Sequence, residues 1–120
     1  MSEAPMKKSY NLEERTLEFG KRIIRLCKAL LPNTINFKLI DQITRSGTSV
    51  GANYREANET LTKKDFKFKI GICLRESKET VYWLQLIIEA NSEFEKRIES
   101  LLKENRELVK IFAAILIKSK

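Results

Sequence analysis

The sequence predicts an all-α protein, folded as an antiparallel up-and-down four-helix bundle. The 120 residues include only 4 Gly and 2 Pro and are rich in Leu, Ile, Lys and Glu, a composition that favours helices over disorder. Four stretches repeat apolar residues at intervals of three and four, the spacing of an amphipathic helix. No stretch alternates as a strand does, and the connections between the four are short, as in a bundle.

The first two predicted helices span residues 12–31 and 36–58. Proline cannot continue a helix, so Pro32 and Asn33 should separate them. In the first helix the core face is Leu12, Thr16, Phe19, Ile23, Leu26 or Cys27, and Leu30. In the second it is Ile40, Ile43, Gly47, Val50, Tyr54 and Ala57, with Leu61 just beyond.

The third predicted helix opens at Thr62, whose hydroxyl can cap it, with Asp65 placed to complement the helix dipole. Its core face is Phe66, Ile70, Cys73, Ser77, Thr80 or Val81, Leu84 and Ile87. The fourth runs from Ser92 or Glu93 to Lys118, with Ile98, Leu101, Leu108, Phe112, Ile115 and Leu116 inside. We therefore expect an N-terminal tail, residues 1–11, followed by one bundle domain, residues 12–120.

The composition argues against an enzyme. The chain has no histidine, which removes the commonest general base and the usual ligands of a di-iron bundle. Glu76 and Glu79 imitate half of such a metal motif, but without histidine we expect no metal, no cofactor and no catalytic residue. Cys27 and Cys73 lie on apolar helical faces, as buried thiols do. No secretory leader or membrane-spanning stretch is visible, so we expect a cytoplasmic protein.

Basic residues form two outward rows on the predicted helices. The net charge is +7, with 23 Lys and Arg against 16 Asp and Glu. The first row is Lys21, Arg25 and Lys28, and the second is Lys64, Lys67, Arg75 and Lys78. Such rows can bind the phosphates of nucleic acid, and Tyr82 and Trp83 could stack on bases. The alternative is a solvated face with local ion pairs.

The stretch "RSGTSVGANYREAN", residues 45–58, places glycines inside the second helix, where each costs roughly 1 kcal/mol relative to Ala. Gly47 lies on the core face and should let a neighbouring helix approach closely. A second face carries short or polar side chains that favour contact with another helix or subunit: Arg45, Ser49, Ala52, Asn53 and Glu56. The alternative is an ordinary exposed face.

Together, "NLEERTLEFGKRIIRL", "RSGTSVGANYREAN" and "KKDFKFKIGICLRESKETVYWL" resemble the bacterial bundle proteins encoded in intervening sequences of large-subunit ribosomal RNA genes. That family includes the accessory variability protein of diversity-generating retroelements. The resemblance spans about residues 11–117. It implies a homopentamer with a positively charged surface that binds structured RNA or DNA and has no known enzymatic activity.

Within the resemblance, the residues that match motif positions are Arg45, Ser46, Ser49, Asn53, Glu56, Asp65, Phe66, Glu76, Glu79, Tyr82 and Trp83. We expect Phe66 and Trp83 to pack, and Glu76 and Glu79 to pair with basic groups on a neighbouring helix or subunit. The basic rows remain the candidates for ligand contact. The leading hypothesis is an oligomeric nucleic-acid-binding bundle. The alternative is a protein-interaction scaffold or accessory subunit, for example for a reverse transcriptase.

Overall fold

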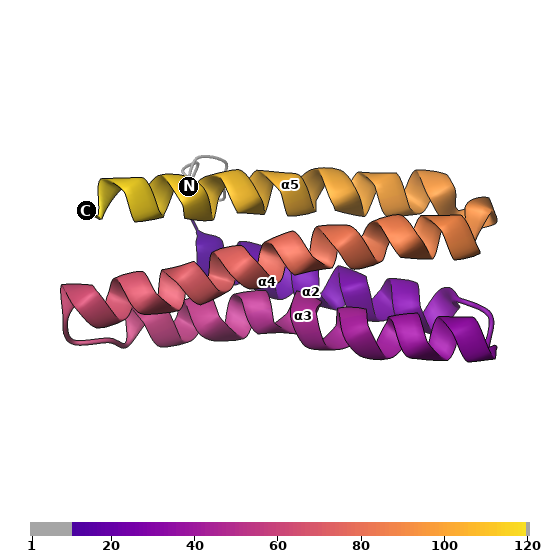
Figure 1. Ribbon diagram of the computed structural model, residues 1–120, viewed down its shortest axis with the longest axis horizontal. Coiled ribbons are helices and arrows are strands. Elements are labelled where there is room, and N and C mark those ends of the chain that lie inside the picture. The colour runs from indigo at the N-terminus through magenta and orange to yellow at the C-terminus, as the bar shows by residue number, and fades with distance from the viewer. Residues whose placement is uncertain (1–10, 120) are drawn as a thin grey trace, which may run out of the picture.

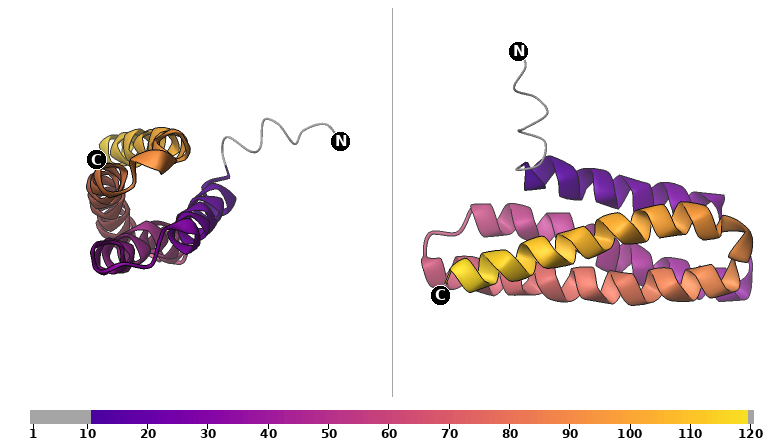
Figure 2. Two further views of the ribbon diagram at one scale, coloured as in Figure 1. Left: turned by 90° about the vertical axis from the view of Figure 1, so that its right-hand side faces the viewer. Right: turned by 90° about the horizontal axis from the view of Figure 1, so that it is seen from above.

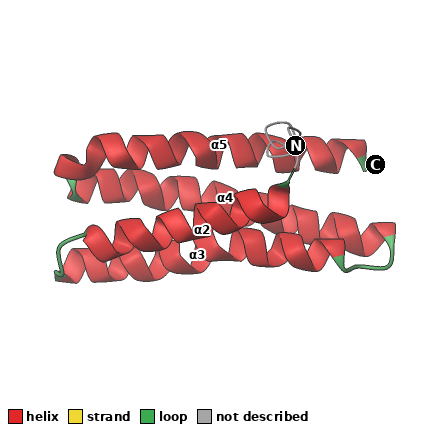
Figure 3. Ribbon diagram, turned by 180° about the vertical axis from the view of Figure 1, so that it is seen from behind, coloured by secondary structure: helices red, strands yellow, loops and turns green. Residues whose placement is uncertain are grey.

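The computed structural model describes residues 11–119 as four long helices joined by short loops (Figures 1 and 3). The helices are α2 (Leu12–Ala29), α3 (Thr34–Asn58), α4 (Lys63–Ala90) and α5 (Glu95–Lys118), and a short 3-10 helix, η1 (Ser92–Phe94), precedes α5. Successive helices run in opposite directions (Figure 1). Residues 11–119 contain no strand, and the predicted four-helix bundle is confirmed. Except for Asn11, the predicted tail lies outside the described residues.

Side chains cap the start of three helices. Asn11, Asn33 and Thr62 each accept a hydrogen bond from the backbone N–H three residues on, as an N-cap does. The predicted cap at Thr62 is therefore confirmed. Helix α2 ends at Ala29, two residues before the predicted end, because Pro32 disfavours helical backbone at the residue before it. The Asn33 cap starts α3 at Thr34 instead of Asn36.

The core lies along the shared axis of the helices and contains most of the predicted positions. The large side chains that are almost fully buried are Phe19, Ile23, Leu26, Ile43, Val50, Ile70, Leu84, Ile87, Ile98, Leu108 and Phe112. Cys27, Ile40, Tyr54, Phe66, Val81, Ile115 and Leu116 are only partly buried and pack against this core. The prediction was wrong for Leu61, which is 97% exposed because α3 ends at Asn58 and residue 61 lies in the loop.

The end-on view in Figure 2 shows the order of the helices around the bundle. Helix α3 packs on α2 and α4, and α4 packs on α3 and α5, whereas α2 and α5 meet only sparsely. The backbones of helices α2 and α4 do not approach each other closely, so these two helices lie diagonally across the bundle. The line where α2 and α5 face each other, which we call the α2–α5 seam, is thus the least tightly closed side of the molecule.

The glycines of α3 allow α2 to pack directly against its backbone. A Cβ atom at Gly47 would lie 2.9 Å from Cγ1 of Ile23. At Gly51 it would lie 3.1 Å from Oγ1 and 3.3 Å from the carbonyl carbon of Thr16. These distances are shorter than normal carbon contacts, so the predicted close approach at Gly47 is confirmed and extends to Gly51. Gly71 on α4 differs, since a Cβ there would meet nothing within 4 Å.

Candidate nucleic-acid interface

The basic residues predicted on the third helix line the outward side of α4. We call Lys64, Lys67, Arg75 and Lys78 the α4 row; Lys67 is half-buried and the others are exposed. Arg75 lies 3.9 Å from a carboxylate oxygen of Glu76. The three lysines form no ion pair with any residue in the described part of the chain, so their charges are available to a ligand.

The other predicted row, Lys21, Arg25 and Lys28, lies exposed along α2, and we call it the α2 row. Arg25 donates a hydrogen bond of 3.0 Å to Glu18, and this bond holds the pKa of the Glu18 carboxyl below its usual value. Because α2 and α4 are diagonal, the two rows face different sides of one chain. They cannot form one flat patch within a single protomer.

Two aromatic side chains on α4 accompany the basic residues. Tyr82 is 53% exposed and Phe68 is 67% exposed. The Tyr82 ring packs edge-on against Trp83, with 5.0 Å between ring centroids. Trp83 itself is half-buried, and its indole N–H donates a hydrogen bond of 2.9 Å to Glu79. Of the two aromatic residues predicted as stacking candidates, Tyr82 has the more exposed ring.

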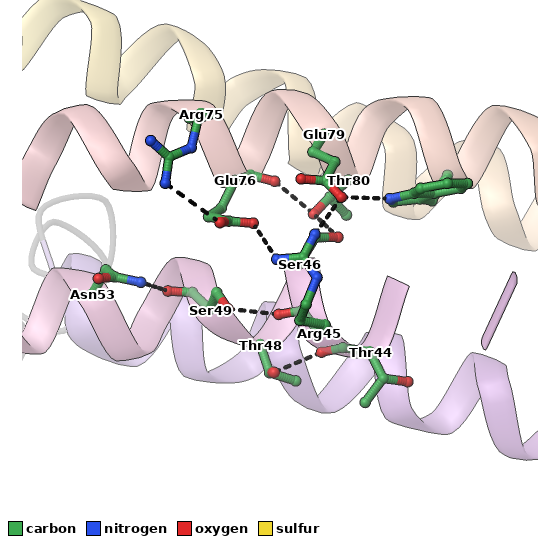
Figure 4. Close-up of polar contacts among 11 residues, drawn as sticks. Thr44, Arg45, Ser46, Thr48, Ser49, Asn53, Arg75, Glu76, Glu79 and Thr80 are labelled. Atoms are coloured by element: carbon green, nitrogen blue, oxygen red, sulfur yellow. Dashed lines mark hydrogen bonds and ion pairs between the residues drawn. The ribbon is translucent and has the colours of Figure 1, made fainter. Parts of the chain in front are cut away.

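Four residues of the motif meet in what we call the Arg45 cluster: Arg45, Glu76, Glu79 and Trp83. Figure 4 shows Arg45 reaching from α3 toward Glu76 and Glu79 on α4. From α3, the Arg45 guanidinium donates one hydrogen bond to Glu76, at 3.1 Å, and another to Glu79. The bonds from Trp83 and Arg45 lower the pKa of Glu79, and the bond to Glu79 raises the pKa of Arg45. Both carboxylates therefore have a basic partner on the neighbouring helix of the same chain.

The remaining small and polar residues of this α3 face bond mainly within their own helix. The Ser49 hydroxyl donates to the Arg45 carbonyl at 2.6 Å, and the Asn53 amide donates to the Ser49 carbonyl at 2.9 Å. Glu56 forms an ion pair with Lys69 of α4 at 2.6 Å. Ala52, which comes between Ser49 and Glu56 in the sequence, is exposed. The structure thus uses Arg45 and Glu56 to join α3 to α4, and it leaves the short side chains on the outside.

Sequence patterns did not identify several polar contacts between helices. In the core, the Thr80 hydroxyl lies 2.9 Å from that of Ser46, and both residues are fully buried. Near the loops, the Asn36 and Asn91 amides exchange hydrogen bonds of 3.0 and 2.9 Å. Each pair joins residues far apart in the chain, and helical spacing carries no signal for such contacts. Arg22 and Arg97, which line the α2–α5 seam, were missed for the same reason.

The described residues contain no group of three or more His, Cys, Asp or Glu side chains that could hold a metal ion. The two carboxylates considered as a metal half-site, Glu76 and Glu79, instead bind Arg45. Among the described helices, none is long and apolar enough to cross a membrane.

Comparisons with known proteins place this geometry in a family. The family model described as 23S rRNA-intervening sequence protein matches residues 8–114. A crystal structure from Bacteroides thetaiotaomicron VPI-5482, of a protein of unknown function from the S23 ribosomal protein family, is 38% identical with a TM-score of 0.80. The match covers 87% of this chain and 96% of that one. Among curated proteins no match was found. The chain belongs to the 23S rRNA-intervening sequence protein family.

Proposed function

We propose that this protein is a non-enzymatic, oligomeric bundle that binds nucleic acid, either structured RNA or DNA, in the cytoplasm and without a cofactor. The observation that carries the proposal is the α4 row, where Lys64, Lys67 and Lys78 have no carboxylate partner among residues 11–119. The family description, which refers to a sequence within 23S rRNA, supports an RNA-related role.

The arrangement of the α4 row along one helix supports phosphate binding. Its members lie on one side of α4 from Lys64 to Lys78, a span of about 21 Å at 1.5 Å per residue, along which a nucleic-acid backbone presents several phosphates. Neutralising phosphates releases counterions, so such binding weakens steeply as salt rises. The exposed rings of Phe68 and Tyr82 add stacking surfaces beside the charges, which suits unpaired bases.

Self-association would strengthen this binding, because several copies of one weak surface act together on a long ligand. We propose a homo-oligomer, and the number five comes from the resemblance to the family. Support comes from apolar side chains left outside the bundle, which we call the apolar stripe on α2: Leu17 and Ile24 lie seven residues apart on α2 and are each 44% exposed, and Leu31, in the loop that follows the helix, is 62% exposed. Exposed apolar stripes of this kind mark interaction surfaces.

The oligomer is tested with Ala52→Arg, since Ala52 is exposed on the α3 face proposed to contact another subunit. If that face is the interface, the variant is a folded monomer by light scattering, with unchanged helical circular dichroism. An intact oligomer would place the interface elsewhere, and the apolar stripe on α2 would be the next candidate.

Nucleic-acid binding is tested by fluorescence anisotropy with a labelled structured RNA and a matched DNA duplex over a salt series. The test variant replaces Lys64, Lys67 and Lys78 with Gln. A control replaces Lys103, Arg106 and Lys110, which lie together on α5, and removes the same charge. We expect the test variant to bind more weakly, and its salt slope to flatten by about one for each lysine that contacts a phosphate.

Equal losses in the two variants would reject the α4 row and leave only general charge attraction. No binding of wild-type protein to either ligand at low salt would reject the proposed function. In that case the exposed apolar stripe on α2 favours the second candidate, a protein-interaction scaffold or an accessory subunit, for example of a reverse transcriptase. Where a neighbouring gene encodes a reverse transcriptase, a pull-down of that enzyme with this protein then tests the alternative.

A further inference from the structure

The α2–α5 seam contains a groove lined by arginines, two of which belong to neither basic row. It has a volume of about 190 Å³ and is lined by Arg22 and Arg25 of α2, by Arg97 of α5, and by Leu26 and Leu101. The two leucines are buried and form its floor. Three arginines from two helices therefore line one hollow, on the side of the bundle where the helices pack least closely.

Elsewhere along the same seam, an arginine has a full carboxylate partner. Arg15 of α2 donates two hydrogen bonds to Glu104 of α5, at 2.7 and 2.9 Å, with both side chains largely covered. This paired arrangement closes that part of the seam. It also raises the pKa of Arg15 above its ordinary value through the bond to Glu104.

The arginines that line the groove have no such carboxylate partner among the described residues of the opposite helix. Arg25 bonds Glu18, an exposed pair, and Arg22 donates to the neutral hydroxyl of Ser100 at 3.1 Å. Arg97 forms no hydrogen bond or ion pair with any residue that the structure describes. Three positive charges and one negative charge leave an excess of two positive charges at this hollow. Like charges that line one hollow repel one another, and an anion between them would offset that repulsion.

We propose that this groove binds the phosphate groups of a ligand. Guanidinium groups present paired N–H donors that match phosphate oxygens, and three of them can surround one group. At about 190 Å³ the groove is smaller than the roughly 300–1,000 Å³ of pockets that enclose whole organic ligands. It therefore suits one or two phosphates, with the rest of the ligand outside.

Two sources share this chemistry: a phosphodiester of bound nucleic acid, and a free phosphate or diphosphate. The first rests on the proposed function. It is favoured by Arg25, which belongs both to the groove and to the α2 row, so that the two form one continuous basic surface along α2. A nucleic-acid backbone following the α2 row would thus reach the groove without leaving the protein surface.

The experiment compares Arg97→Gln with Arg106→Gln, a matched control that removes the same charge from an exposed arginine of α5 outside the groove. Both variants are tested in the full chain for binding of inorganic pyrophosphate by calorimetry and of structured RNA by anisotropy. Circular dichroism checks the fold. We expect Arg97→Gln to lose about tenfold or more of the affinity for a phosphate ligand, as the loss of a charged hydrogen bond does, and Arg106→Gln to lose far less.

The outcomes separate the groove from the proposed function. A selective loss with RNA makes the ligand a nucleic acid, whereas a selective loss with pyrophosphate alone makes it a free phosphate compound. Pyrophosphate binding that depends on Arg97, in a protein that binds no RNA or DNA, would keep the groove and reject the proposed function. Equal behaviour of the two variants with both ligands would overturn the groove, even where RNA binding itself is strong. Arg22→Gln, on the opposite helix, provides an independent repeat.

Discussion

Replacing Gly47 and Gly71 separately with alanine tests whether close packing explains the glycines of α3. Alanine gains about 1 kcal/mol of helix propensity over glycine at either position. At Gly71 nothing opposes this gain, because the new Cβ meets no atom within 4 Å. At Gly47 the Cβ would lie 2.9 Å from Cγ1 of Ile23, which is fully buried, so Ile23 or a helix must shift. Overpacking of this kind costs about 1–3 kcal/mol.

The two variants should therefore change stability in different directions. Gly71→Ala should raise the free energy of unfolding by about 1 kcal/mol, and Gly47→Ala should leave it unchanged or lower it by up to about 2 kcal/mol. The propensity gain is common to both, so their difference isolates the contact with Ile23. Urea unfolding at one fixed protein concentration measures it, since self-association would make stability depend on concentration.

A double-mutant cycle with Ile23→Ala assigns the effect to a specific contact. In that background the clashing carbons are gone, so Gly47→Ala should become stabilising by about 1 kcal/mol or more as it partly refills the space. The coupling between the two sites should be at least about 1 kcal/mol. If Gly47→Ala stabilises the wild-type protein as much as Gly71→Ala does, close packing of α2 on α3 is not the reason for this glycine.

Three further predictions concern polar and thiol side chains. Trp83→Phe removes a hydrogen bond to Glu79 and should raise the pKa of that carboxyl toward its usual value. A carboxyl whose pKa is lowered in the folded state stabilises the fold above its unfolded-state pKa, and this gain is lost as the pH falls through the folded-state pKa. The variant should therefore be less stable than wild type at neutral pH and no less stable in strong acid. Urea unfolding at both pH values measures this. Burial raises the pKa of Cys73 to about 12, so at pH 8 a thiol reagent should modify Cys73 only after unfolding, whereas the half-buried Cys27 should react sooner. Thr80→Val should cost about 1 kcal/mol by leaving the buried Ser46 hydroxyl without its partner, and Ser46→Ala with Thr80→Val should cost less than the two single changes added, since both members of the pair are then gone.

Helical periodicity was enough to predict the elements and most of the core. Positions such as Phe19, Ile43 and Leu84 recur at three and four residues, and burial of one helical face follows directly from that spacing. The error at Leu61 has the same origin, because the apolar spacing in the sequence continues past Asn58, the residue at which α3 ends. The end of α2 and the start of α3 each differ from the prediction by two residues, because a proline and a helix cap fix these boundaries and the apolar spacing does not.

The candidate site could be predicted only in part. Each basic row was visible because its members share one helix, and Arg45 and Glu79 belong to motifs that stand out in the sequence. Which helices neighbour each other is a tertiary property, however, and no local pattern shows that α2 and α4 are diagonal. The convergence of Arg22 and Arg97 likewise depends on the α2–α5 seam and requires the folded chain.

Ion pairing between helices explains where the excess positive charge of this protein lies. Several carboxylates form ion pairs with basic residues of a neighbouring helix: Glu104 with Arg15, Glu56 with Lys69, and Glu76 and Glu79 with Arg45. A net charge of +7 is therefore not spread evenly over the surface. Much of it remains on side chains without such partners, in the α2 row, the α4 row and the groove of the α2–α5 seam. We therefore expect that charge removal at these positions weakens the binding of a polyanion more than equal removal on the outer face of α5.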